Sequence, residues 1–306
     1  MAIIDYAVLD TDGIRMDLMI ENEVRALLHD SASIRNSGAL IFAGDVSGIG
    51  SDTIALRYSS LDGYTEMSAV ADGTDIANTD LTNATANVAV ARQGLRYDLT
   101  DLASLSGFGN DIDVFRLAES MRGAFEARFM TLLGATFAGI TAQAGTSNVA
   151  LSVDDFMDAI YQLELNNNPH DLACMLAPRQ VADLQASIRN ETGNAIAFNP
   201  AQSEILKMVG QGFIGSFMGV DIHKSDKCAT VATDRIGAMW SRVAIAYAQG
   251  TPQPLAVGGV IRPAGTPVMV ELQRDASLSL TEIVGTAYCG VALVEDARAC
   301  EIISKA

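Results

Sequence analysis

The most regular pattern of hydrophobic and polar positions lies about a third of the way along the chain, between residues 111 and 136. Apolar side chains recur there every three or four residues, which is the period of an α-helix with one buried face. Opposite charges stand three or four positions apart on the other side, which favours a solvated helix face. The pattern therefore predicts one helix over residues 111–136, about 40 Å long, which is enough to cross a whole domain. The predicted buried positions are Val114, Leu117, Met121, Phe125, Phe129, Leu132 and Thr136, and the predicted exposed positions are Asp113, Arg116, Glu119, Arg122 and Glu126.

A different period, with every second residue apolar, precedes this helix. Residues 54–58 and 88–99 alternate in this way, which predicts two strands that each bury one face. The segment between them, residues 60–87, is too long and too polar for a tight hairpin turn. Loops of this length are usually functional or disordered, and a two-stranded extension without its own core is only marginally stable. We therefore expect a long hairpin that rests on a neighbouring molecule.

Helical and strand patterns alternate in the second half of the chain. Ser152 stands as an N-cap before a helical pattern that has Met157 on its apolar face, and Pro178 stands at the start of another helix. These elements predict an α+β fold in which the long helix packs across a sheet built from the hairpin strands and the C-terminal strands. The strand patterns cover residues 172–176, two short segments around Gly219, 238–248 and 268–303, and weaker patterns predict a helix at 14–28 and a strand at 39–43.

The composition is poor in charge for a chain of this size. Of the 306 residues, 49% are hydrophobic and only 19% are charged, whereas about 25% charged residues is usual. A lone soluble molecule needs more charge on its surface, and large permanent interfaces resemble a domain core cut in half. We therefore expect much of the outer surface to be buried against other subunits. An ordinary alanine-rich enzyme is the alternative.

The net charge of −17 argues against a protein that binds nucleic acid specifically, because there is no basic stripe to hold phosphates. Acidic walls would instead suit a container that holds nucleic acid without sticking to it, since like charges repel within a Debye length. The four cysteines are scattered and form no CxxC pair, so we expect buried, reduced thiols. Neither a signal peptide nor a membrane-spanning run of about 20 apolar residues is expected.

One short motif near the N-terminus suggests an enzyme. Asp10 and Asp12, followed by Gly13, resemble the first motif of haloacid dehalogenase-type phosphatases, in which such residues act as nucleophile and as acid/base beside magnesium. Those enzymes also need a downstream lysine and a paired-acid metal motif, but the first lysine here is Lys207 and no clear acidic pair follows it. An acidic turn is the simpler interpretation, and a phosphatase is a distant alternative.

No other cluster predicts a catalytic, cofactor or metal site. Asp72, Asp75 and Asp80 miss the oxygen spacing that a calcium loop uses. The three histidines lie far apart in different contexts, so they do not form a metal motif. We therefore expect no enzyme activity, no cofactor and no metal.

Four segments follow one another along the chain: VAVARQGLRYDLTDLASL before the long helix, then NNNPHDLACMLAPRQVADL, GSFMGVDIHKSD and ELQRDASLSLTEIVGTAYCGVALVEDARACEII. Their order and spacing resemble those of tailed-bacteriophage major capsid proteins of the Hong Kong 97 type. The resemblance covers roughly residues 35–304 and depends on the order of the motifs, because each motif alone is degenerate. It implies a fold with an N-terminal arm, an extended E-loop hairpin, a P-domain with a long spine helix, and an A-domain.

The resemblance also implies a division of the chain into domains. The expected ranges are 1–50 for the N-terminal arm, 51–95 for the E-loop hairpin, 96–149 for the P-domain with its spine helix at 111–136, 150–260 for the A-domain, and 261–306 for strands that return to the P-domain. The chain would then leave one domain, build a second one and come back.

A capsid protein of this type would self-assemble into pentamers and hexamers of an icosahedral shell that encloses phage double-stranded DNA. The implied location is the virion, after assembly in the cytoplasm of the host bacterium, and the implied partners are further copies of the chain, a separate scaffolding protein, a portal and a decoration protein. Residues 51–95 contain no lysine, so we expect no E-loop isopeptide crosslink. An encapsulin, a cellular shell protein with the same fold, is the leading alternative.

Charged residues on the hairpin are the candidates for contacts between subunits. Three arginines stand near its base and three acids at its tip, so they could form ion pairs from one copy to the next, each worth at most about 1 kcal/mol. The base residues are Arg57, Arg92 and Arg96, and the tip residues are Glu66, Asp72 and Asp75.

Overall fold

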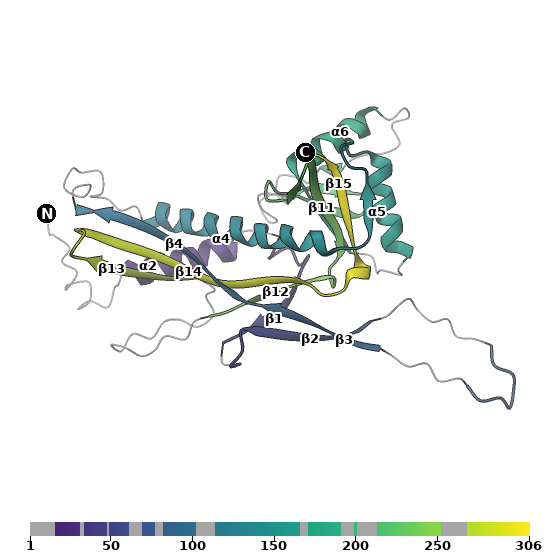
Figure 1. Cartoon of the computed structure of the whole chain (residues 1–306), viewed down its shortest axis with the longest axis horizontal. Coiled ribbons are helices and arrows are strands. Elements are labelled where there is room, and N and C mark those ends of the chain that lie inside the picture. Colours follow the sequence, from purple (N-terminus) through teal and green to yellow (C-terminus); the bar gives the residue numbers. More distant parts are fainter. Residues whose placement is uncertain are drawn as a thin grey trace.

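Two β-sheets joined by one long helix make up the body of the molecule, and a hairpin projects from it (Figure 1). Helices and strands are mixed along the chain, as the predicted α+β class requires. The computed structural model describes residues 16–30, 34–47, 49–60, 69–76, 82–101, 114–165, 171–190, 199–200, 213–251 and 268–306.

The first sheet, called the long sheet below, is organised around strand β14 (Leu280–Leu293). Strand β4 (Ala91–Thr100) pairs with it antiparallel along one edge. Along the other edge, β13 (Val268–Asp275) and β12 (Ile245–Gln249) follow one another, both antiparallel to β14. Strand β1 (Ile41–Asp45) extends the sheet by pairing parallel with β12.

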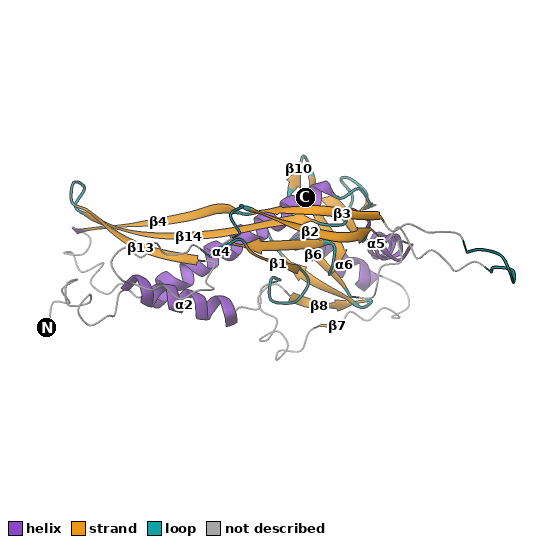
Figure 2. Ribbon diagram, turned by 90° about the horizontal axis from the view of Figure 1, so that it is seen from below, coloured by secondary structure: helices purple, strands orange, loops and turns teal. Residues whose placement is uncertain are grey.

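The predicted long helix is confirmed as α4 (Val114–Thr136), with residues 111–113 outside the described part of the chain. It crosses the long sheet beside a second helix, α2 (Met16–Asp30), which matches the weak N-terminal helical pattern (Figures 1 and 2). Met121 and Phe125 of α4 pack with Val24 of α2 in one buried cluster against strands β13 and β14. No helix in the described ranges is both long enough and apolar enough to cross a membrane.

The hairpin consists of β2 (Thr53–Ser60) and β3 (Thr82–Ala89), which pair antiparallel. Residues 88–99 were expected to form one arm of it. Instead, the hairpin arm ends at Ala89, and the chain enters β4, which pairs with β14 and not with β2. Alternation alone could not show this break, because both halves bury every second residue. Of these two strands, only β4 packs with the long helix, through Leu95 and Tyr97.

The hairpin base packs against one end of the long sheet. Ile54 and Leu56 of β2 and the buried Val88 of β3 contact Ala246 and Ala248 of β12 in one apolar cluster. Residues 69–76, drawn in teal at the far end of the hairpin in Figure 2, stand apart from the rest of the described chain in both views. The hairpin is therefore anchored at its base and extended beyond the body.

The second sheet, called the compact sheet, carries two helices on one face. Helix α5 (Val153–Leu165) begins at the predicted N-cap, where Ser152 Oγ accepts a hydrogen bond of 3.1 Å from the Asp155 N–H. Helix α6 (Pro178–Asn190) begins at the predicted proline. The strands, in order across the sheet, are β5 (Gln143–Gly145), β15 (Ala299–Lys305), β11 (Asp234–Ser241), β6 (Leu172–Leu176), β9 (Val220–Lys224), β8 (Phe213–Phe217) and β7 (Asn199–Pro200), and β10 (Thr230–Val231) pairs with β11.

Two strands lie in a different sheet from the one expected. The segment 238–248 is not one strand: it divides at residues 242–244 into β11 of the compact sheet and β12 of the long sheet. The C-terminal strand β15, expected to return to the long sheet, pairs with β11 and β5 of the compact sheet. A short 3₁₀ helix at Asp296–Arg298 separates β15 from β14. Each sheet therefore contains a strand from the part of the sequence that was expected to build the other sheet. The expected domain boundary near residue 260 does not separate the strands of the two sheets.

The two sheets are held together where the C-terminal end of α4 meets the compact sheet. Trp240 of β11 is fully buried there, and its ring centroid lies 5.5 Å from that of Phe137, in the 3₁₀ turn Phe137–Gly139 that follows α4. Its indole N–H donates a hydrogen bond of 2.9 Å to the carbonyl oxygen of Ala39, just before β1. Elements from both sheets therefore share one core at this junction.

Candidate functional site

The three hairpin arginines lie on the outer surface, but they do not share one environment. Arg57 of β2 and Arg92 of β4 are exposed, and neither forms an ion pair with a residue in the described part of the chain. Arg96 is bound within its own chain: its Nε lies 2.6 Å from Asp98 Oδ1 and its Nη1 lies 2.9 Å from Glu282 Oε1. Arg57 and Arg92 are therefore the arginines open to a partner.

The tip of the hairpin presents two carboxylates beside two apolar side chains. Asp72 and Asp75 are exposed. The Thr74 N–H donates to the carbonyl oxygen of Ala71 at 3.1 Å, which closes a turn that contains Asp72 and ends just before Asp75. Val70 and Ile76 flank the turn with exposed fractions of 42% and 76%. The third predicted tip acid, Glu66, lies outside the described residues. No ion pair joins Asp72 or Asp75 to the base arginines within one chain, so such pairs would need a second copy.

Helix α5 carries an exposed apolar stripe, which the sequence patterns did not predict. Met157, Tyr161 and Leu165 follow one another at intervals of four residues, and their exposed fractions are 41%, 59% and 61%. The sequence interpretation placed Met157 on the buried face, and this was wrong. Phe156 and Leu163 occupy that face, because it is the side that contacts the compact sheet.

A cleft of about 440 Å³ lies where α4 meets the compact sheet. Arg122 and Glu126, predicted to be solvated, are half-buried here, because α4 packs on the long sheet on one side and meets the compact sheet on another. The Arg122 Nε atom and the Glu126 Oε1 atom are buried and make no hydrogen bond with any described group. The cleft is lined by Arg35, Arg122, Gly123, Phe125, Glu126, Ala127, Phe129, Met130, Pro178, Lys224, Ser225, Asp226 and Lys227.

Gly134 of α4 lets the loop at residues 225–228 approach the helix and so shapes this cleft. A Cβ atom at Gly134 would lie 2.6 Å from the carbonyl oxygen of Lys227, which is closer than real contacts allow. Exchanging glycine for alanine inside a helix normally stabilises a protein by about 1 kcal/mol. At Gly134 we expect the clash to outweigh this gain, so that the alanine variant lowers the midpoint of urea-induced unfolding.

Gly123 of the same helix is the matched control for this prediction. A Cβ atom there would meet nothing within 4 Å, so the alanine variant should raise the unfolding midpoint. If both variants shifted the midpoint in the same direction, the close contact between α4 and Lys227 would be contradicted.

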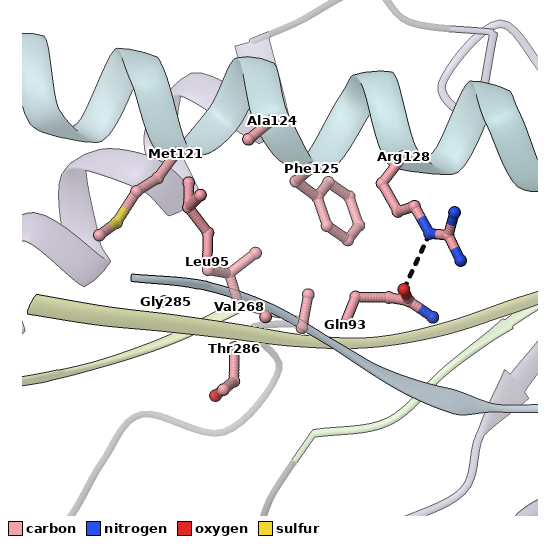
Figure 3. A pocket seen from close by; sticks show the side chains of 11 residues that line it. Gln93, Leu95, Met121, Ala124, Phe125, Arg128, Val268, Gly285 and Thr286 are labelled. Atoms are coloured by element: carbon pink, nitrogen blue, oxygen red, sulfur yellow. Dashed lines mark hydrogen bonds between the residues drawn. The ribbon is translucent and has the colours of Figure 1, made fainter. Parts of the chain in front are cut away.

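A second hollow, of about 250 Å³, lies between α4 and the long sheet (Figure 3). Met121 and Phe125 point into it from the helix, and Leu95 lines it from β4. At one end the Arg128 Nε donates a hydrogen bond of 2.8 Å to Gln93 Oε1. The walls are mostly apolar and hold no pair of acid and base, so the hollow has the chemistry of incomplete core packing, not of a catalytic site.

Burial keeps the titratable side chains of His223, Cys228 and Cys300 uncharged at neutral pH. Burial lowers the pKa of His223 in β9 to about 4, so this imidazole is neutral at pH 7. Burial raises the pKa of Cys228 to about 12 and that of Cys300 to about 12, which keeps both as unreactive thiols. Within the described ranges, no group of three or more His, Cys, Asp or Glu side chains could hold a metal ion. Asp10 and Asp12 of the phosphatase-like motif lie outside those ranges.

No protein-family model matches the sequence, and no curated protein matches it. The fold does match solved structures, although their sequences differ widely from this one. The capsid structure of the cyanophage P-SCSP1u is 16% identical, with a TM-score of 0.55 over 87% of this chain and 86% of that chain. The capsid of Ralstonia phage GP4 is 14% identical, with a TM-score of 0.53 over 87% and 86% of the two chains.

An encapsulin has a similar degree of likeness. In the holo-SrpI encapsulin complex from Synechococcus elongatus PCC 7942, the matching chain is 14% identical, with a TM-score of 0.55 over 88% of this chain and 87% of that chain. The fold expected from the order of the sequence motifs is therefore confirmed: the chain is folded like phage capsid proteins and encapsulins over most of its length.

Proposed function

We propose that this chain is the major capsid protein of a tailed bacteriophage, which self-assembles into the pentamers and hexamers of an icosahedral shell around double-stranded DNA. The observation that carries the proposal is the match to phage capsid chains over 87% of the sequence, in a molecule whose hairpin extends away from its own body. A hairpin held only at its base needs a second surface to rest on. Its function is therefore structural, and no reaction is assigned to it.

In this proposal the elements take the family's domain roles, with changed boundaries. The β2–β3 hairpin is the E-loop, α4 is the spine helix of the P-domain, and the compact sheet with α5 and α6 is the A-domain. Strand β12 then joins the P-domain and β15 joins the A-domain, because of their hydrogen-bond partners. Residues 1–50 would include the N-terminal arm, of which α2 packs on the P-domain.

Assembly would proceed by many small contacts between identical copies. A single exposed ion pair contributes at most about 1 kcal/mol, but the contacts of a closed shell repeat with its symmetry, and binding of each copy stabilises its neighbours. Arg57 and Arg92 at the hairpin base, and Asp72 and Asp75 at its tip, are exposed, so each can pair with an opposite charge of another copy. Arg96 is assigned a lesser role, since Asp98 and Glu282 already hold it. Glu66 remains a candidate for such pairs on the basis of the sequence.

The wider assignment follows the same proposal. The protein would reside in the virion after assembly in the cytoplasm of the host bacterium, with a separate scaffolding protein, a portal and a decoration protein as partners. It would enclose DNA without binding a specific sequence, which agrees with the net charge of −17.

Electron microscopy of the purified protein tests the proposal. Closed particles of uniform size are expected, together with rapid sedimentation. A protein that sediments as a single compact subunit at every concentration and salt condition would refute the proposal, because a shell protein must associate with itself.

An encapsulin is the second candidate, favoured by the match to the Synechococcus elongatus shell protein. The content of particles isolated from their natural source separates the two candidates. Genomic DNA is expected in a capsid, whereas a packaged enzyme without DNA would establish an encapsulin.

The apolar stripe on α5 provides a prediction for assembly. We expect the double substitution Tyr161→Ser and Leu165→Ser to reduce the yield of particles at least tenfold, because it removes exposed apolar surface that neighbouring copies would bury. The unfolding midpoint of the free subunit should stay nearly unchanged, since neither side chain belongs to the core cluster beneath α5. Asp158→Ser, an exposed position on the same helix, is the control and should assemble normally. If the double variant assembled at full yield, the apolar stripe on α5 would not be a contact between subunits.

A further inference from the structure

The cleft between α4 and the compact sheet is a local concentration of positive charge in an acidic molecule. Four basic residues line it, against the two acids Glu126 and Asp226, whereas the whole chain has a net charge of −17. Lys224 and Lys227 are two of only four lysines in the sequence. An anionic group is therefore the ligand that the electrostatics of this cleft favour.

The buried atoms of the cleft specify that ligand more closely. The Arg122 Nε has a proton to donate and the Glu126 Oε1 has a lone pair to accept one, and both are buried without a partner. A buried polar group without a hydrogen-bond partner destabilises the fold, so both groups gain from a ligand that supplies the partner each one lacks. Such a ligand carries an acceptor for the arginine, for which the positive charge of the cleft favours a carboxylate, and an N–H or O–H group for the glutamate. A polypeptide turn that contains aspartate offers both, whereas a phosphate of DNA offers only acceptors.

The cleft also has apolar lining residues, and these indicate which side chains the ligand should carry. Phe125, Phe129, Met130 and Pro178 are the apolar residues of the lining beside the charged groups. Arg35 lies over the Phe125 ring at 5.7 Å, and burial lowers the pKa of its guanidinium. The cleft therefore suits a segment in which carboxylates alternate with apolar side chains.

The tip of the hairpin is a segment of this composition. Within residues 69–76, Asp72 lies inside the closed turn Ala71–Thr74 and Asp75 follows it directly, and Val70 and Ile76 beside them are exposed. The backbone N–H groups of the turn supply donors. In one chain the tip stands well apart from the corner where α4 meets the compact sheet (Figure 1), so the tip that fills the cleft would have to come from another copy.

We propose that the cleft of one subunit receives the hairpin tip, residues 69–76, of a second copy of this chain. An aspartate of the tip binds Arg122, and Lys224 and Lys227 lie nearby in the same cleft. A backbone N–H of the tip donates a hydrogen bond to Glu126. Val70 or Ile76 packs against the apolar residues of the lining. The proposal rests on the function proposed above and names the receptor for a hairpin contact that the sequence assigned only to Arg57, Arg92 and Arg96.

Cysteine crosslinking tests the contact directly. The variant with Asp75→Cys and Lys227→Cys should form a ladder of disulfide-linked oligomers when assembled particles are oxidised and run on denaturing gels without reductant. Both positions are exposed, and the four native cysteines are buried, so the background should be low. Each single variant should give no ladder. Asp75→Cys combined with Lys305→Cys, at the C-terminal end of β15, is the matched control and should give none either.

Removal of charge tests whether the contact matters. Asp72→Asn with Asp75→Asn should lower particle yield at least tenfold, and Lys224→Gln with Lys227→Gln should do the same. The control for the aspartate pair, Asp52→Asn with Glu119→Gln, also removes two negative charges, from exposed positions elsewhere, and should assemble normally. Added salt should not restore the particle yield of these variants, because salt screens the ion pairs that remain.

The outcomes separate this inference from the proposed function. If wild-type subunits never form particles, the function fails. If particles form, but Asp72→Cys and Asp75→Cys each fail to crosslink to Lys227→Cys and the asparagine pair assembles at full yield, the cleft is not the receptor and the capsid proposal stands.

Discussion

Replacement of residues 59–83 by a two-residue Asn-Gly turn is expected to abolish closed particles while leaving the subunit folded. Tyr58 pairs with Ala84 across the hairpin, so a turn at this position joins two residues that are already adjacent. The apolar base of the hairpin, including Ile54, Leu56 and Val88, keeps its contacts with β12. Only the part that extends beyond the body is lost.

Sedimentation and electron microscopy of this variant give the decisive measurement, with the urea midpoint of the free subunit as a check on folding. Addition of the shortened subunit in excess should also inhibit assembly of the wild-type chain, because it still presents a cleft but offers no tip to the next copy. Normal particles built from the shortened subunit alone would show that the hairpin is dispensable and would remove the main support for its role.

Gln180→Ala is expected to lower the free energy of unfolding by an amount on the order of 4 kcal/mol. Gln180 at the start of α6 is fully buried, and its Oε1 accepts a hydrogen bond of 2.9 Å from the Ala177 N–H. Its Nε2 donates to the carbonyl oxygens of Arg235 and Ile302, each at 3.1 Å. Truncation removes the hydrogen-bond partner of three backbone groups, two of which bond to it in fully buried positions, and opens a cavity between α6 and the compact sheet.

Gln162→Ala is the matched control, since the Gln162 side chain donates to the Gln143 carbonyl oxygen at 3.0 Å in an exposed position. Water can replace this bond, so a loss below about 1 kcal/mol is expected. Urea unfolding of both variants measures the difference. Equal losses would mean that the Gln180 bonds do not hold α6 on the compact sheet.

Local signals in the sequence were sufficient for most single elements. The apolar period of α4, the cap at Ser152 and the proline at the start of α6 each act within a few residues, so the printed sequence contains them. The turn at Gly219 likewise separates two strands that pair directly with each other, β8 and β9.

The partners of the strands could not be predicted in the same way. Strands β11 and β12 are separated by only three residues, yet they join different sheets, and β15 pairs with strands more than fifty residues away. Apolar alternation reports that a strand buries one face, but it does not report which strand lies beside it. The break between β3 and β4 could not be predicted for the same reason, because both strands show the same apolar alternation.

The charged cleft was missed because helix periodicity describes a helix with one buried side. Arg122 and Glu126 lie on the side opposite the apolar stripe, and this side becomes buried only because the compact sheet, built from later residues, meets α4 there. One signal was available in the sequence: the segment HKSDK puts Lys224 and Lys227 together in a chain that otherwise has almost no lysine.

The continuity of β3 and β4 has a mechanical consequence. Only Val90 separates the two strands, and a Cβ atom at Gly290 of β14 would lie 1.9 Å from the Ala89 carbonyl oxygen, so the backbones cross in direct contact. No slack linker lies at this crossing to absorb a pull on the hairpin. Tension applied to the hairpin would pass along the covalent chain into β4, and from there through the pairing with β14 to the sheet beneath α4. In the proposed shell, a pull by one subunit on the hairpin of another would therefore load the centre of that subunit and not only its edge.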